Sequence, residues 1–424
     1  MIVPAYQAHG LLDPALSENS PGTFRHLYKW YLQMRDSPEE YNRFLNKILH
    51  PIGEKRPLQA NQTTAAYYLN EAVGFLAELL AMVPTQARPL IAPRPEVMGC
   101  PDILELCHLI FGSADPVVAF EAQRKLYLTK LFFDVDHCWE VQRGAEHKEY
   151  FEAILERELF SRKSSSRRVE VCYSLGPDGE SIQYNMGRRE AGQECWTFDL
   201  EEIDLLREGR PIHFRIYYHS CRFKREIIPY QYERGAERYH LSPTEMWPGL
   251  TKRRSASIVS KMLRKGENDP RWVEDLIGVM FIVESLYEVE NLKETLFDLF
   301  GGVFRIRNPV DTLTRPADRA LLNPYSGPGY EVYKAEIDLL YNPEQQRLPM
   351  PYFFTVEMQM YTLESYLRTI HSSHYASHQE FKRRQFLQGL VPYLFPAQVY
   401  GEEALRVLVG EGEAAGPRAA GERS

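Results

Sequence analysis

Residues 276–283 read LIGVMFIV, and this almost unbroken apolar run limits the fold more than any other stretch of the chain. A strand with one face in water alternates apolar and polar residues, whereas a strand covered on both faces is apolar nearly throughout. The run therefore predicts a buried strand with other elements packed on both of its faces. Asp275 stands at the mouth of this strand.

A basic helix followed by a short turn is predicted before that strand, in the first part of residues 251–283. Thr251 or Ser255 can cap its start. Arg254, Ser257 and Lys261 then fall on one helical face. Cations on a helix beside a strand-end carboxylate are the groups that a site for phosphate and magnesium requires. A solvated basic helix next to a core strand explains the same residues.

Composition and charge narrow the class of protein. The 424 residues are enough for two or three domains, and the 44% of apolar residues and 25% of charged residues are typical of globular proteins. The net charge of −8 argues against non-specific binding of nucleic acid or anionic membranes by the whole chain. No secretion signal opens the sequence, and the longest apolar stretch, 72–83, is too short to span a bilayer. A cytoplasmic protein without a membrane partner is expected.

The six cysteines stand at positions 100, 107, 138, 172, 195 and 221 and make no C-x-x-C pair. Scattered cysteines of this kind predict reduced structural thiols rather than a disulfide framework or a zinc site. Cys100, Cys107 and His108 are close in sequence, but their spacing gives little support to a metal site.

Residues 1–160 are predicted to form a helical N-terminal region. Ser37-Pro38 supplies an N-cap followed by a first-turn proline, and Asp115-Pro116 repeats this signal. Helices are predicted after Ser37 and at 65–83, 102–112, 116–133 and 146–161. No catalytic groups gather here, so the expected roles are packing, regulation or partner binding.

Residues 161–240 are predicted to form a β-rich region. The basic, serine-rich stretch 161–168 suggests an exposed linker. Strands are predicted at 169–175, 181–186, 213–219 and 222–232, and a short helix at 200–207. Arginines and tyrosines interleave between 213 and 232. Such a surface can hold single-stranded RNA by stacking and charge, and an amphipathic sheet with solvated arginines explains it as well.

Residues 241–400 carry two strands with polar side chains in mid-strand. Alternation along 330–341 places Tyr330, Lys334, Glu336 and Asp338 on one face, and alternation along 352–360 does the same for Thr355, Glu357 and Gln359. A carboxylate and an amide side by side are unusual in a covered sheet. Further elements are predicted at 286–300 and 362–378 (helices) and at 303–307 (a strand). Residues 401–424 are predicted to be a largely disordered tail.

Five segments in order resemble the synthetase domain of the RelA/SpoT alarmone synthetases: SIVSKM, VEDLIGVMFIV, GYEVYKAEI, VEMQMYT and HSSHY. The resemblance covers residues 247–375. It implies an α+β fold, with a nucleotidyltransferase-like mixed sheet flanked by helices. It also implies a magnesium-dependent transfer of pyrophosphate from ATP to the ribose 3′-hydroxyl of GDP or GTP, with release of AMP.

The resemblance assigns roles to residues of this chain. Asp275 and Glu357 take the positions of the magnesium carboxylates, with Gln359 beside them in the catalytic group. The ATP phosphates are assigned to Arg253, Arg254, Ser257 and Lys261. The acceptor is assigned to Tyr330, which would stack on guanine, together with Lys334 and His371.

Several positions depart from the family pattern. Met280, Tyr361 and Thr251 stand where the family has arginines, and Lys334 stands where it has a histidine. Arginine binds phosphate in a two-pronged manner that these residues do not copy. Three functions therefore remain open: an alarmone synthetase, a pyrophosphotransferase acting on tRNA, and a non-catalytic nucleotide sensor or partner-binding scaffold. The N-terminal half shows no hydrolase motif of the HD type.

Overall fold

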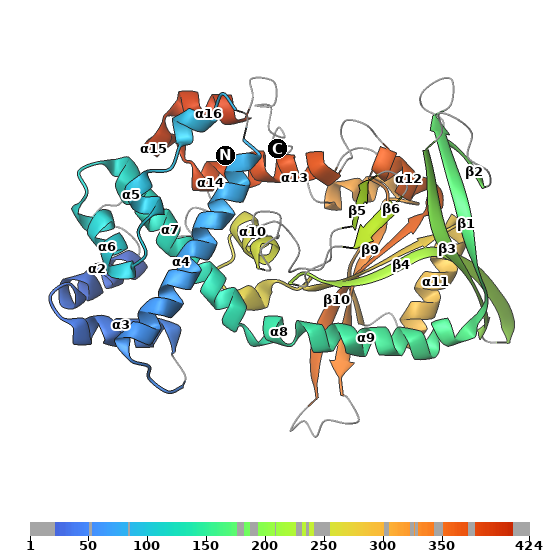
Figure 1. Ribbon diagram of the computed structural model, residues 1–424. Helices are drawn as coiled ribbons and strands as arrows, with labels where there is room; N and C mark the ends of the chain where they lie inside the picture. Colours follow the sequence, from blue (N-terminus) through green and yellow to red (C-terminus); the bar gives the residue numbers. More distant parts are fainter. Residues whose placement is uncertain are drawn as a thin grey trace, which may run out of the picture. The chain divides into compact units, whose positions relative to one another are not determined.

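The structure is a computed structural model that describes residues 22–50, 53–83, 85–175, 182–186, 194–207, 209–225, 231–234, 237–240, 255–300, 305–322, 326, 330–342, 351–371 and 378–409. The chain divides into two compact units that alternate along the sequence (Figure 1). The first unit comprises 1–138, 227–273 and 383–424, and the second comprises 139–226 and 274–382.

The first unit is mainly helical. Its helices are α2 (Gly22–Met34), α3 (Pro38–Leu49), α4 (Leu58–Ala81), α5 (Pro95–Met98), α6 (Ile103–Gly112), α7 (Pro116–His137), α10 (Ala256–Lys265), α14 (Val391–Leu394), α15 (Ala397–Tyr400) and α16 (Glu402–Val409), and α13 (His378–Gly389) enters it. It also holds the strand pair β5 (Gln231–Arg234) and β6 (Glu237–His240). The N-caps predicted at Ser37 and Asp115 are confirmed, since both side chains accept backbone hydrogen bonds of the helices they precede.

Helix α7 forms the centre of this unit and carries charged residues that are fully buried. The Lys125 ammonium donates to the carbonyl oxygens of Val97, Met98 and Cys100 at 2.6–3.0 Å. It therefore supplies hydrogen-bond donors to carbonyl groups at the C-terminal end of α5, which have no partner within the helix. Arg124 donates to the Leu394 carbonyl at 2.6 Å. These bonds compensate for the burial of charge and fix α7 against its neighbours. Among the described residues, no helix combines the length and the apolarity needed to cross a membrane.

The second unit is built on an eight-stranded sheet in the order β2-β1-β3-β4-β7-β10-β9-β8. The strands are β1 (Lys163–Leu175), β2 (Ile182–Met186), β3 (Glu194–Arg207), β4 (Arg210–Phe223), β7 (Ile277–Val283), β8 (Ile306–Asp311), β9 (Tyr333–Tyr341) and β10 (Tyr352–Thr362). Among the strand pairs that the structure describes in this sheet, β7–β10 alone is parallel. The helices are α8 (Trp139–Gln142), α9 (Gly144–Glu158), α11 (Leu286–Leu299) and α12 (Leu363–His371). The predicted α+β class with a mixed sheet flanked by helices is confirmed.

Helices pack on both faces of this sheet. On one face, His147 of α9 stacks on Phe354 of β10 with ring centroids 4.6 Å apart. On the other face, Leu363 and Leu367 of α12 join a buried cluster with Ile282 of β7. The apolar run at 277–283 is accordingly buried at five of its seven positions, which confirms the prediction of a covered strand.

Three predictions for the β-rich region were wrong. Residues 161–168 are not a linker, because β1 begins at Lys163, and 213–223 belongs to one strand, β4. Residues 200–207 are the end of β3 rather than a helix. Strands β1–β4 of this region belong to the same sheet as β7–β10, whereas β5 and β6 form a separate pair.

Two further expectations met a different outcome. Cys172 and Cys195 form a disulfide, because antiparallel pairing of β1 and β3 sets them directly opposite each other with Cα atoms 4.0 Å apart. Their separation of 23 residues gave no sign of this pairing. At the C-terminus, residues 402–409 form α16, and the rest of the predicted tail lies outside the described residues.

Candidate functional site

The candidate site lies on one face of the sheet of the second unit, where β7 and β10 run side by side. Glu357 of β10 pairs with Gly278 of β7, and on its other side with Glu336 of β9. Val356 and Met358 are buried, whereas Glu357 is only partly so. The polar face predicted from the alternation of β9 and β10 is therefore present.

Both carboxylate oxygens of Glu357 have partners. Oε1 pairs with the Lys334 ammonium, and Oε2 accepts a hydrogen bond of 3.1 Å from Nε2 of Gln359. A Cβ on Gly278 would lie 4.0 Å from Oε2, which is ordinary van der Waals contact, so Gly278 lies directly beside the carboxylate.

Asp275 lies just before β7 and is 7% exposed. Its carboxylate pairs with the Lys224 ammonium. Lys224 is held at this point because its backbone N–H donates to the Leu276 carbonyl at 2.8 Å, which extends the pairing of β4 with β7. Sequence reasoning did not single out Lys224, since it follows a strand in a basic segment without a motif.

The charges of Asp275 and Glu357 reach the same ammonium. Burial by itself lowers the pKa of Lys334, but the charge and hydrogen bond of Glu357 and the charge of Asp275 together outweigh it. The pKa of Lys334 is consequently raised above its ordinary value. Asp275 and Glu357 therefore both lie within electrostatic range of Lys334.

A chain of hydrogen bonds joins Tyr330 to Glu357. The Tyr361 hydroxyl lies 3.0 Å from the Tyr330 hydroxyl and 3.1 Å from Oε1 of Gln359. Because Oε1 can only accept, Tyr361 donates to it and accepts from Tyr330. Gln359 then donates to Glu357 through Nε2. Tyr361, at a position where the family pattern has an arginine, thus orients both the amide and the neighbouring ring.

Tyr330 packs in the core and also lies near the carboxylate site. Its ring packs against the buried cluster and meets Tyr361 edge to face at 6.1 Å. Burial raises the pKa of its hydroxyl, and the charge of Glu357 adds to that shift. The ring is therefore a packed side chain that also borders the carboxylate site.

Arg307 of β8 is, like Lys224, a cation near the site that the sequence analysis did not single out. Its guanidinium donates to Glu274 at 3.1 Å, to Asp338 at 2.9 Å and to Thr355 at 3.1 Å. Thr355 in turn donates to Asp338 at 2.8 Å. This network fixes the chain immediately before Asp275, because Glu274 is its neighbour in sequence.

The remaining predicted site residues come from other parts of the chain. Arg253 and Arg254 lie outside the described residues, and Ser257 and Lys261 lie on α10 of the first unit. His371 ends α12, and its side chain is not described. Ser255 precedes α10 as predicted, but its hydroxyl donates to Asp136 at 2.6 Å instead of capping the helix.

The donors at Asp275 and Glu357 suit a magnesium ion in kind. Hard carboxylate oxygens are the ligands that Mg²⁺ prefers, and Mg²⁺ takes only one or two of them when substrate phosphates and water complete its shell. Within the described ranges no group of three or more His, Cys, Asp or Glu side chains is placed to hold a metal. A cation at this site would have to replace the ammonium groups that now pair with the carboxylates.

Two of the interleaved arginines and tyrosines of 213–232, Arg215 and Tyr217, take part in the packing of the second unit. Arg215 pairs with Glu284 and Glu288, and Tyr217 is 1% exposed. Tyr217 donates to Glu284 at 3.2 Å. These two side chains do not offer a free stacking surface for RNA.

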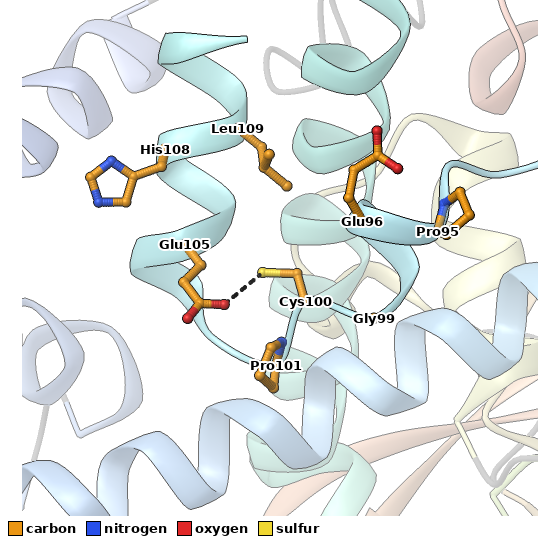
Figure 2. Close-up of a pocket in the computed structure, with 8 residues that line it drawn as sticks. All are labelled: Pro95, Glu96, Gly99, Cys100, Pro101, Glu105, His108 and Leu109. Carbon is orange, nitrogen blue, oxygen red and sulfur yellow. Dashed lines mark hydrogen bonds between the residues drawn. The ribbon is translucent and has the colours of Figure 1, made fainter.

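Cys100, Cys107 and His108 do not gather around a metal position. Cys100 and His108 line a cavity of about 430 Å³ in the first unit (Figure 2). The Cys100 thiol donates to Glu105 at 3.7 Å, whereas the ring of His108 bonds the Tyr31 hydroxyl at 2.8 Å. Figure 2 shows the His108 ring turned away from Cys100.

Comparison with known proteins gave matches only among solved structures. No protein-family model and no curated protein matches the chain. The chain is similar to small alarmone synthetase 1 of Bacillus subtilis bound to its product pppGpp, at 19% identity over 26% of this chain and 52% of that one, with a TM-score of 0.20. It is similar to small alarmone synthetase 2 of the same organism at 18% identity over 36% and 58%, with a TM-score of 0.21. A GTP pyrophosphokinase family protein from Streptococcus pneumoniae matches at 18% identity over 36% and 64%, with a TM-score of 0.21. The chain thus spans less than two thirds of the length of each of these proteins.

Proposed function

We propose that this protein is a magnesium-dependent pyrophosphotransferase that moves pyrophosphate from ATP to the ribose 3′-hydroxyl of GDP or GTP. The observation that supports the proposal is the ion pair of Glu357 with Lys334, whose ammonium also lies within the electrostatic range of Asp275. Glu357 lies on β10, and Asp275 precedes the neighbouring parallel strand β7. These residues belong to the sequence segments that resemble the alarmone synthetases.

In this proposal the acceptor 3′-oxygen attacks the β-phosphorus of ATP. A bond forms between them, the bond from the β-phosphorus to the oxygen of the α-phosphate breaks, and AMP leaves with that electron pair. Glu357 orients the hydroxyl and takes its proton, which a carboxylate within hydrogen-bond reach can do. Mg²⁺ bound by Asp275 and Glu357 would neutralise charge on the phosphates.

The other residues of the site hold the reactants in this proposal. Lys334 meets an acceptor phosphate, and the Tyr330 ring stacks on the purine base from its fixed position beside Tyr361. Gln359 keeps Glu357 oriented through its 3.1 Å hydrogen bond. Such positioning is the main contribution that a protein makes to phosphoryl-type transfer.

A non-catalytic nucleotide sensor or partner-binding scaffold is the second candidate. Two observations favour it: each carboxylate is already paired with a lysine, and Met280 and Tyr361 stand where the family has arginines. A sensor needs to bind nucleotide but not to transfer a group. The tRNA acceptor is a third candidate, motivated by the arginines and tyrosines of 213–232, of which Arg215 and Tyr217 are occupied within the sheet.

Identification of products from ATP labelled in its β-phosphate separates these functions. The protein is offered GDP, GTP, ATP or tRNA in turn, with Mg²⁺ present. We expect the label on the guanosine nucleotide together with one AMP per transfer. Label on tRNA would favour the third candidate, and nucleotide binding without any transfer would favour the sensor.

A further inference from the structure

The candidate site contains two ion pairs, each between a carboxylate and a lysine ammonium. Asp275 pairs with Lys224, and Glu357 pairs with Lys334. The carboxylates are the less exposed members, at 10% and 12% of their side-chain surface, against 29% and 34% for the lysines. The negative charges of the site are thus matched by ammonium groups that are nearer to solvent.

The two members of each pair differ in freedom of movement. Glu357 is fixed in the middle of β10 with Gln359 on its second oxygen, and Asp275 is fixed at the start of β7. Lys224 and Lys334 approach from the flanking strands β4 and β9 on four-carbon stems that rotate easily. The ammonium groups can therefore move while the carboxylates stay in place.

A divalent cation and a lysine compete for the same oxygens. Because a partly buried ammonium needs an anionic partner, a lysine displaced by the cation requires a new one. The phosphates of a nucleotide that arrives with the cation would supply it.

We propose that Lys224 and Lys334 are exchangeable counter-ions, which neutralise the carboxylates without ligand and transfer to nucleotide phosphates when a divalent cation takes their place. This inference rests on the proposed function, since it takes Asp275 and Glu357 as the cation ligands. It adds a regulatory property: the cation and the polyphosphate bind together, and each binds poorly alone. The site then does not take up a free cation in the absence of nucleotide.

The test is the coupling between cation and nucleotide. Calorimetric titration gives the Mg²⁺ affinity with and without the nucleotide pair of GDP and α,β-methylene-ATP, whose bridging carbon prevents transfer. In the wild type the nucleotide should tighten Mg²⁺ binding. In Lys334→Met, Mg²⁺ should bind more tightly without nucleotide, and the coupling factor should fall by about 5-fold or more. Direct chelation of Mg²⁺ by the nucleotide is the same in all variants and cancels in the comparison.

Two control variants separate charge exchange from other effects. Lys163→Met removes the 2.7 Å ion pair with Glu201, on β1 and β3, and should leave the coupling factor unchanged. Lys334→Arg keeps the positive charge and should retain most of the coupling. If Lys334→Met does not fold, Lys224→Met provides the same test at the second pair.

An unchanged coupling factor in folded Lys334→Met would overturn the proposal. An equal fall of the coupling factor in Lys334→Met and Lys334→Arg would overturn it as well. The product assay on the same proteins distinguishes this failure from failure of the proposed function. If the protein transfers pyrophosphate but shows no coupling, the counter-ion exchange is wrong and the proposed function stands. If it shows coupling but no transfer, the exchange stands and the protein is a nucleotide sensor.

Discussion

At the scale of single residues, Tyr361 links the apolar cluster to the carboxylate site. Its hydroxyl contacts Tyr330 at 3.0 Å and Gln359 at 3.1 Å, and the residue itself is 4% exposed. Burial raises the pKa of Tyr361 well above its ordinary value, so the hydroxyl keeps its proton. The hydroxyl is therefore a permanent donor to Gln359.

Replacement of Tyr361 by phenylalanine should destabilise the protein and loosen the site. The change leaves Oε1 of Gln359 and the Tyr330 hydroxyl without this partner, which costs about 1–3 kcal/mol when such groups are buried. Urea unfolding measures the loss. Tyr366, whose ring lies 5.8 Å from that of Tyr361, provides the matched control. Equal losses in Tyr361→Phe and Tyr366→Phe would contradict the role of the hydroxyl chain.

Sequence reasoning found part of this site because some residues break a pattern. Glu357 and Gln359 stand out as polar side chains in the middle of an apolar strand. Lys224 and Arg307 break no pattern, since charged residues are expected near strand ends. Their roles depend on which strands become neighbours, and only the fold decides that.

At the scale of elements, strand pairing also explains why residues 200–207, the end of β3, were wrongly predicted to be a helix. Leu200 and Ile203 are both fully buried and stand three residues apart, which is a helical spacing. The pairing of β3 with β1 shifts by one residue beside Ile203, so the strict alternation of a strand is lost there. The alternation in β9 and β10 has no such interruption, and their faces were predicted correctly.

The docking of α9 on the sheet should make stability depend on pH. His147 is 3% exposed, stacks on Phe354 and bonds the Tyr352 hydroxyl at 2.8 Å. Burial, with the charge of Arg143, lowers the pKa of His147 to about 4. Above pH 6.5 the ring is neutral in both states, whereas between about pH 6.5 and 4 only the unfolded state takes the proton. Stability should therefore fall as the pH falls through this window.

The expected loss between pH 7 and pH 5 is roughly 2 kcal/mol. Urea unfolding of the wild type and His147→Gln at both pH values isolates the contribution of the ring, because other titrating groups are common to both proteins. The variant should lose less stability over this interval. The same loss in both proteins would show that His147 is not the group responsible.

At the scale of the whole molecule, the two units interleave along the chain. The first unit collects three segments and the second collects two. Regions predicted from composition follow the sequence in order, so they cannot show that β1–β4 join the sheet of β7–β10. The pairing of distant strands is set by packing of the complete chain.

Hydrogen exchange should localise nucleotide binding to one unit. Ligand that binds only the folded site slows local opening there. With GDP and Mg²⁺ present, peptides from β7 and β10 should exchange more slowly, and peptides from α4 and α7 of the first unit should not change. Protection confined to α4 and α7 would place the nucleotide away from the Asp275–Glu357 site.

The rate of AMP release from ATP in the presence of GDP and Mg²⁺ tests the central claim most directly. Glu357→Gln keeps the shape of the side chain but removes its charge, and Glu336→Gln makes the same change at the residue paired with Glu357 on β9. We expect the Glu357→Gln rate to fall by about 10²–10⁴-fold, as for loss of a general base. The Glu336→Gln rate should stay near that of the wild type. Equal rates in the wild type and Glu357→Gln would contradict a pyrophosphotransferase centred on this carboxylate.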